Sequence, residues 1–429
     1  MVAALSAVLS IAPLRADESA ALRQQLPTLK GAERLSALEQ LYNLSQDSDD
    51  VDYQLRCLNE FHDEACRLDC LNEEASALAS KALLFYNNDM NDSVLTIVPG
   101  YMKRLKQLKE FRVYYEMWSY IAETYIFSGQ NSRALDETKA MYEDAKQQEN
   151  PLGMGQAYCL MGMAYSNLRN FDESVEAFKK GISILMAEPK LTPFLPDAFS
   201  YYGDVLNSMK AYEELEQLTV EWESVLKHFI EQHGIEGTPS ADVCWSYYFM
   251  ACAQASLGQG KLDEAALKLQ RMRELITSED SYRGRAWLYY MSELMLRKGD
   301  LQQALDYSTR RLAVQTDDGD KAVIVMINQQ RAEIMQQLGH YKEAAQLFRF
   351  VYQLNDSLNA QETKKQLNEM STQFGLAELE KAQARLKMQQ QEEQMRWMMA
   401  VAAIVVVSLA VFLFFRIRSA RKQIGRAHV

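Results

Sequence analysis

The cysteines and histidines are the side chains with the most evident capacity for chemistry. Six cysteines and five histidines are scattered over 429 residues. Cys66 and Cys70 are four residues apart, so their thiols share one helix face and offer half of a soft-metal site. No second pair follows at ligand spacing, and His228 and His233, five apart, do not share a helix face. We therefore predict no metal site and leave the pairing of the cysteines open.

Motifs for catalysis and cofactor binding do not occur in the chain. GxGxxG, GxxxxGK[ST], GxSxG and HExxH are all missing, and carboxylates such as Glu392 and Glu393 follow no partner pattern. We predict no catalytic residue and no cofactor. The net charge is −12, and the only basic run free of acids lies near the C-terminus, so we expect no nucleic-acid partner.

The composition favours helices over every other element. Glycine and proline number 18 and 8, which is too few for folds rich in tight turns. Strong helix formers such as Ala, Leu, Glu, Gln and Met fill most of the remainder. The sequence therefore predicts an all-α protein.

A repeat of about 40 residues runs through the middle of the chain. Small residues at 122, 162, 203, 253, 292 and 332 are spaced by 40, 41, 50, 39 and 40, and a weaker copy is centred near Lys81. A second small or apolar residue follows about twelve positions after each. We predict pairs of helices that approach closely at these small residues and stack on neighbouring pairs.

Glycines mark the turn between the two helices of most pairs. Gly129, Gly260, Gly299 and Gly339 lie where the first helix ends, a position that favours positive φ. The unit at Gly203 departs from this pattern, because Lys210 stands at its turn.

These units resemble the tetratricopeptide repeat, with its small residues, turn glycine, and Ala and Phe in the second helix. The resemblance implies an inner groove lined by the first helix of each pair, which binds a protein or peptide ligand. Its lining, carried over position by position, is Glu116, Ser119, Glu123, Gln156, Asp197, Asp204, Asn207, Tyr247, Gln254, Tyr289, Glu293 and Arg297. The tyrosines and tryptophans that recur in the first helices are expected to serve mainly in packing.

Both ends of the chain carry signals for export and membrane insertion. Residues 1–16 are typical of a signal peptide, with an apolar stretch that ends at Ala12 and a small residue, Ala16, at a plausible cleavage point. The basic n-region of such a signal is missing, so we expect the signal to be incomplete or the start codon to be misplaced. Residues 397–415 are uncharged and long enough to span a bilayer, with Trp397, Arg416 and Arg418 as anchors. The denser basic charge after this run places the C-terminus in the cytoplasm and the preceding domain in the periplasm of a single-pass inner-membrane protein.

A helix with coiled-coil tendency is predicted between the repeats and the membrane. Its apolar positions in 359–396 are Leu367, Met370, Phe374, Leu379 and Leu386, with a change of register between them. The segment could transmit a change of register or act as a passive stalk, and we expect a homodimer through 361–396.

The predicted organisation is therefore a signal peptide over 1–16, a repeat domain over 17–358, a signalling helix over 359–396, a membrane helix over 397–415 and a cytoplasmic stub over 416–429. Residues 424–429 match one reading frame of a common sequencing adapter, so we expect the natural chain to continue after about Gln423.

This organisation resembles the bacterial membrane sensor histidine kinases whose periplasmic domain is built of tetratricopeptide repeats. The stretches 26–31 (LPTLKG), 52–59 (DYQLRCLN), 85–88 (FYNN) and 152–155 (LGMG) look like that group. The resemblance covers the sensory half only, so it implies a receptor for a peptide, protein or other ligand without the kinase domain. A one-span transcription regulator and a membrane-anchored adaptor remain alternatives.

Overall fold

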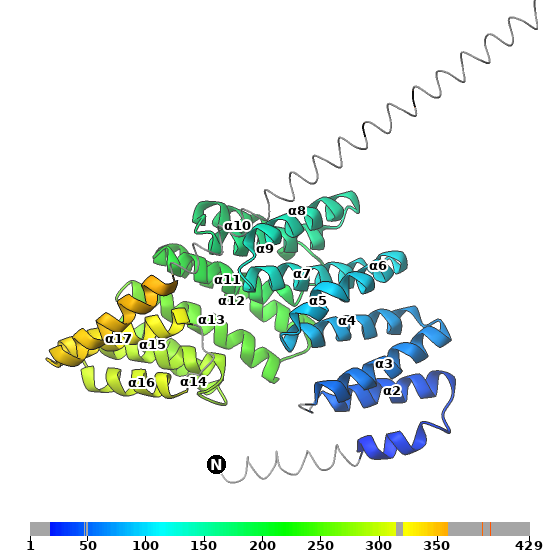
Figure 1. The fold of residues 1–429 in the computed structure, drawn as a ribbon, viewed down its shortest axis with the longest axis horizontal. Helices are drawn as coiled ribbons and strands as arrows, with labels where there is room; N and C mark the ends of the chain where they lie inside the picture. Colours follow the sequence, from blue (N-terminus) through cyan, green and yellow to red (C-terminus); the bar gives the residue numbers. More distant parts are fainter. Residues whose placement is uncertain are drawn as a thin grey trace, which may run out of the picture. The chain divides into compact units, whose positions relative to one another are not determined.

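The computed structural model describes residues 18–46, 48, 50–314 and 321–358, together with 388 and 395. Within these residues the chain forms helices and short loops and no strand, which confirms the all-α prediction for the described part (Figure 1). The helices are α2 Gly31–Ser45, α3 Val51–Leu68, α4 Leu71–Asn87, α5 Asn91–Thr96, α6 Val98–Leu108, α7 Phe111–Phe127, α8 Asn131–Gln147, α9 Pro151–Asn167, α10 Phe171–Met186, α11 Phe194–Ser208, α12 Tyr212–His233, α13 Pro239–Gly258, α14 Leu262–Glu274, α15 Tyr282–Lys298, α16 Leu301–Ala313 and α17 Lys321–Gln337. Residues 18–25 and 341–358 are also helical.

The helices follow one another as stacked pairs, a tetratricopeptide-like helical repeat fold. From α7 onward each first helix packs on the second helix that comes next in the chain. The first helices also pack on one another in a row, in the order α4, α7, α9, α11, α13, α15 and α17. This row forms one continuous face, which we call the groove face.

The small residues of the repeat are where the two helices of a pair meet. Ala122 and Ala134 are both fully buried, one on α7 and the other on α8. On α15, the Ser292 hydroxyl donates a 2.8 Å hydrogen bond to the backbone oxygen of Ala304 on α16, twelve residues later. The predicted close approach of paired helices is therefore confirmed.

The turn glycines have the backbone conformation that was predicted. Gly129, Gly260, Gly299 and Gly339 have φ values of 71°, 75°, 79° and 81°. Lys210 has a φ of 58° at the corresponding turn, a conformation that costs a residue with a Cβ atom roughly 1–2 kcal/mol. The turn therefore keeps its positive φ even in the unit where lysine replaces glycine.

The irregular units have local causes. The unit near Lys81 is present as α4 packed on α5 and α6, and Pro99, which has no N–H, coincides with the break between α5 and α6. The spacing of 50 between Gly203 and Ala253 accommodates α12, which has 22 residues where α10 has 16. The structure adds one pair that the sequence analysis did not identify, α2 with α3.

The chain divides into two compact units, Met1–Leu354 and Asn355–Val429. The helix pairs belong to the first unit. Among the described residues, no helix has both the length and the apolar character needed to cross a bilayer. The predicted membrane helix at 397–415, the signal peptide and the heptad positions from Leu367 to Leu386 all lie outside the described residues.

Candidate functional site

All twelve residues that the sequence analysis assigned to a groove lie on first helices. They belong to α7, α9, α11, α13 and α15, the first helices of five successive pairs. The structure brings five of them into one electrostatically connected cluster: Glu123, Asp197, Asp204, Tyr247 and Gln254. The centre of the groove face is therefore both acidic and aromatic.

Four carboxylates on α7 and α11 line this face: Glu116, Glu123, Asp197 and Asp204, which we call the groove acids. Glu116 accepts a 3.1 Å hydrogen bond from the Tyr120 hydroxyl. Asp204 accepts a 3.5 Å bond from Nε2 of Gln254. Across residues 18–358, apart from the undescribed positions, none of the four forms an ion pair with Lys or Arg. Arg112 on α7 interacts with Glu116 only electrostatically, so the groove acids lack a paired cation within the described residues.

Burial disfavours the ionised form of these acids. It raises the pKa of Glu123 from its ordinary 4.5 to about 8, against the opposing effect of a hydrogen bond from Tyr86. Burial likewise raises the pKa of Asp204 to about 6. Asp197 remains in contact with water, yet the helices around it exclude enough solvent to raise its pKa to about 6 as well. A cation that enters the groove would restore the ionised state of all three.

Two glutamine side chains on the groove face have an unused acceptor. Gln254 is 4% exposed; its amide nitrogen donates to the Tyr290 hydroxyl at 2.5 Å, whereas its Oε1 has no partner among the described residues. Gln156 is 1% exposed, and its Oε1 is unpartnered in the same way. A buried polar atom without a partner costs roughly 1–3 kcal/mol. Both oxygens are buried, so they can accept a further hydrogen bond only from a group that enters between the helices.

A cleft of about 200 Å³ opens beside the groove acids. Its lining includes Phe127 on α7, Asn167 on α9, and Tyr201 and Asp204 on α11. Phe127 is 60% exposed, which is unusual for an aromatic residue in the middle of a helix stack. The cleft can enclose an apolar stem that carries a charge toward Asp204.

The depth of α9 shapes this cleft. The rings of Phe127 and Tyr201 come within 6.4 Å of one another, although α9 lies between their helices in chain order. Glycines allow α9 to lie close against α10, because a Cβ atom at Gly181 would come within 2.7 Å of the backbone oxygen of Gly155. Side chains of α7 and α11 thus contact one another past α9.

The remaining groove positions have structural partners. Ser119 is buried, with its hydroxyl bonded to the backbone of its own helix. Glu293 and Arg297 pair at 2.6 Å, and Arg297 also donates to the backbone oxygen of Leu257, near the end of α13. Asn207 and Tyr289 are half-buried at the edges of the cluster.

Tyrosines complete the cluster, and the sequence analysis had assigned them to packing or passed over them. Tyr86 on α4 is hydrogen-bonded to Glu123, and Tyr201 interacts with both Glu123 and Asp197. Tyr290 bonds Gln254 and lies near Asp204. Burial raises the pKa of all three hydroxyls, so they remain neutral donors. The recurrence of tyrosine in register was a signal for them, but packing alone also explains that recurrence.

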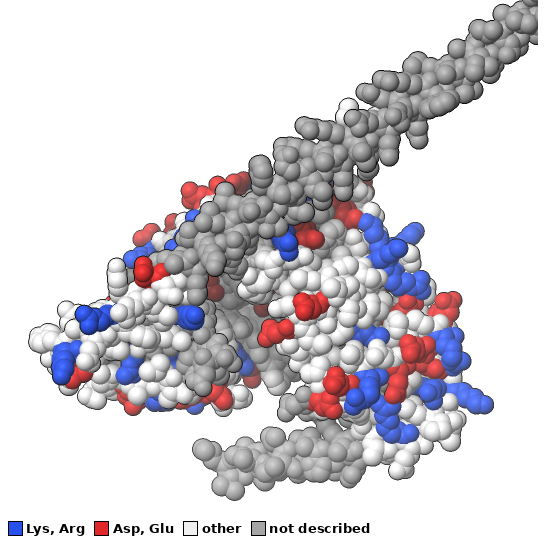
Figure 2. Space-filling view, in the orientation of Figure 1, with Lys and Arg blue, Asp and Glu red and all other residues white. Residues whose placement is uncertain are grey.

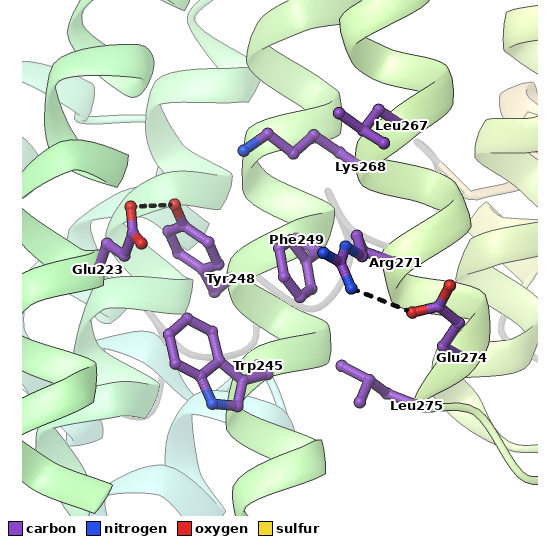
Figure 3. A pocket seen from close by; sticks show the side chains of 9 residues that line it. All are labelled: Glu223, Trp245, Tyr248, Phe249, Leu267, Lys268, Arg271, Glu274 and Leu275. Carbon is purple, nitrogen blue, oxygen red and sulfur yellow. Dashed lines mark hydrogen bonds and ion pairs between the residues drawn. The ribbon is translucent and has the colours of Figure 1, made fainter.

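A second hollow of about 520 Å³ lies among α12, α13 and α14 (Figure 3). Trp245, Tyr248 and Phe249 present their rings from α13. Both acids in its lining have partners. Glu223 accepts a hydrogen bond from the Tyr248 hydroxyl, and Glu274 forms an ion pair with Arg271 at 3.5 Å. This hollow is apolar with balanced charge, and it differs from the groove face in that respect.

Charges elsewhere on the molecule are mixed. On the face drawn in Figure 2, lysines and arginines intermingle with acids over α2–α6. Several of these are paired between helices, as Arg104 is with Glu74 and Lys106 with Asp144. Acids without an ion-pair partner among the described residues, one of them (Glu123) buried, therefore distinguish the groove face.

The raised pKa values predict how stability depends on pH. A carboxyl whose pKa is higher in the folded than in the unfolded chain stabilises the fold fully below the unfolded value, and this contribution is lost as pH rises through the folded value. For Asp197 and Asp204 the loss falls between about pH 4 and 6, and for Glu123 between about 4.5 and 8. We expect the free energy of unfolding, measured by urea titration, to fall from pH 5.5 to 8.5. Replacing Glu123, Asp197 and Asp204 by their amides should make the free energy of unfolding depend less on pH. An unchanged pH dependence would contradict the raised pKa values of these three acids.

Among known proteins, this chain has similar solved structures. The sequence matches no protein-family model and no curated protein. A Rap protein complexed with competence and sporulation factor is 13% identical, covers 82% of this chain and 99% of its own, and has a TM-score of 0.44. The apo form of RapI is 10% identical over 65% of this chain and 97% of its own, with a TM-score of 0.43. A tetratricopeptide repeat protein from Parabacteroides merdae is 12% identical over 68% of this chain and 97% of its own, with a TM-score of 0.41.

Proposed function

We propose that the groove face binds an extended, positively charged ligand, such as a peptide segment containing lysine or arginine. The observation that carries the proposal is the set of enclosed, unpaired carboxylates beside glutamine oxygens that have no partner. A carboxylate held in an enclosed site gains most from a cation that donates hydrogen bonds to it. The cleft beside Asp204 can hold an aliphatic stem.

We further propose that this binding domain is the sensory part of a membrane-anchored signalling protein of the histidine kinase type. The support comes from the sequence, namely the export signal, the heptads of 361–396 and the apolar run 397–415. Ligand binding would favour one of two arrangements of the helix that leads to the membrane, which requires a different affinity for each arrangement. The reading frame after codon 423 tests this part. A phospho-accepting His box with an ATP-binding domain supports it, whereas a DNA-binding motif or a stop codon supports the regulator or the adaptor.

The ligand class is tested by calorimetric titration with a ten-residue peptide of alternating lysine and alanine. Asp204→Asn and Asp197→Asn are each expected to weaken binding about tenfold or more, because one charge-assisted hydrogen bond is worth roughly 1.5–3 kcal/mol. Affinity should rise between pH 5 and 8 as the groove acids ionise, with protons released on binding near pH 6.

A matched control separates the site from general charge. Asp136 is an exposed acid on α8, a second helix, so Asp136→Asn removes the same charge outside the groove face. Binding should survive that change, and the corresponding glutamate–alanine peptide should not bind. If Asp136→Asn and Asp204→Asn weaken binding equally, only net charge matters, and the proposal that the peptide binds at the groove face is wrong.

A further inference from the structure

We propose a binding site for a divalent transition-metal ion of the zinc type, formed by His62, Cys66 and Glu74, far along the chain from the groove acids. His62 and Cys66 lie on α3 and Glu74 on α4. Their ligand atoms, one from each side chain, all lie within 4.8 Å of one another. The proposal is independent of the function proposed for the groove.

The imidazole and the thiol already have the separation that a shared metal requires. His62 and Cys66 are one helical turn apart, and Nε2 lies 3.6 Å from Sγ. Zinc binds sulfur at about 2.3 Å and imidazole nitrogen at about 2.0 Å with tetrahedral angles, which places the two donors about 3.5 Å apart. A metal ion could therefore bind both atoms with little rearrangement of the helix.

The carboxylate is held in place from its other side. Glu74 is 4% exposed, and Arg104 on α6 donates to both of its oxygens, from Nε at 2.6 Å and from Nη2 at 2.9 Å. A carboxylate offers about four lone-pair positions, so these bonds leave room for a metal. The pair with Arg104 also orients Glu74, in the manner of an outer-shell partner.

The histidine has an outer-shell partner of its own. Nδ1 of His62 lies 3.5 Å from a carboxylate oxygen of Asp63, the arrangement that directs Nε2 toward a metal. The charges around the site are Arg104 and the buried Lys81, which are positive, and Asp63, which is negative. The thiolate and Glu74 bring two negative charges to a divalent ion, and Asp63 offsets part of the positive charge of Arg104 and Lys81. Nitrogen, sulfur and oxygen donors in one site favour zinc over calcium or magnesium, and a water molecule can fill the fourth position.

Cobalt(II) titration of the reduced full chain tests the site, because cobalt replaces zinc and absorbs visible light. We expect a thiolate-to-cobalt charge-transfer band in the near ultraviolet with tetrahedral visible bands, and zinc should displace the cobalt. Cys66→Ser should abolish the charge-transfer band, and His62→Ala should weaken cobalt binding more than about 100-fold, since even outer-shell partners are worth 10–100-fold. Both side chains reach the surface, so these variants should fold.

Cys70→Ser is the matched control. Its thiol lies four residues from Cys66 and contacts the backbone oxygen of Leu68, so its loss should leave the bands unchanged. Zinc should raise the melting temperature of the wild-type chain and of Cys70→Ser, but not that of Cys66→Ser. The proposal fails if the wild-type chain gives no charge-transfer band, or if the band persists in Cys66→Ser.

Discussion

Replacing Gly181 by alanine is expected to lower the free energy of unfolding by about 2 kcal/mol, although alanine is normally the better residue in a helix. The new Cβ atom would come within 2.5 Å of Sγ of Cys159, 2.7 Å of the backbone oxygen of Gly155 and 2.9 Å of the backbone nitrogen of Cys159. The two backbone atoms cannot move without shifting α9 against α10. Urea denaturation followed by circular dichroism measures the change.

Gly100 provides the comparison, because it is a helical glycine in α6 with no atom within 4 Å of its added Cβ. Gly100→Ala should be neutral or stabilise the chain by up to about 1 kcal/mol. Gly181→Ala should also weaken binding of the lysine peptide, since it would shift α9, whose Met163 and Asn167 line the cleft beside Asp204. If the two alanine variants have the same stability, the contact between α9 and α10 is not as tight as the structure shows.

Replacing Trp222 by alanine is expected to cost about 3–5 kcal/mol, the range observed when a large aromatic residue leaves a core. Trp222 is 1% exposed on α12. It stacks on Phe199 with ring centroids 5.7 Å apart and meets the ring of Tyr248 edge-on at 5.9 Å. Its removal would open a cavity between α11, α12 and α13, which together position Asp204 and Gln254.

Trp222→Phe should cost far less than Trp222→Ala. The indole Nε1 is buried and has no hydrogen-bond partner among the described residues, so phenylalanine keeps a ring in the core and removes that unpaired donor. We expect a loss of about 1 kcal/mol or less, measured by the same denaturation. A loss as large as that of Trp222→Ala would mean that the indole nitrogen makes a bond that stabilises the fold.

Features that depend on residues close in sequence could be predicted from the sequence. Each turn glycine follows its first helix directly, and its positive φ is a local requirement of the backbone, so Gly129 and Gly339 were identified correctly. The close approach at Ala122 and Ala134 was also predictable, because the two helices of a pair are joined by a short loop. The first helices were predicted to share a face by the same logic, and they do.

Contacts between residues far apart in sequence could not be predicted in this way. The glutamate of the proposed metal site illustrates the difference. The sequence analysis paired Cys66 with Cys70, which are close in the chain, whereas the structure places Cys66 with His62 and Glu74. Glu74 belongs to the next helix, so its approach depends on how α3 packs on α4. Packing of two helices depends on the volumes of many side chains at once, and no local pattern encodes it.

The sequence by itself determined the helices, their pairing and the turns, because these follow from spacing along one chain. The tertiary structure alone decided which of those residues act together. It brought Phe127 and Tyr201 together, buried Glu123, removed much of the water around Asp204, and left Oε1 of Gln254 without a partner among the described residues. Desolvation is the physical reason, because the pKa of a carboxyl depends on all the atoms that displace water around it, and those atoms come from several helices.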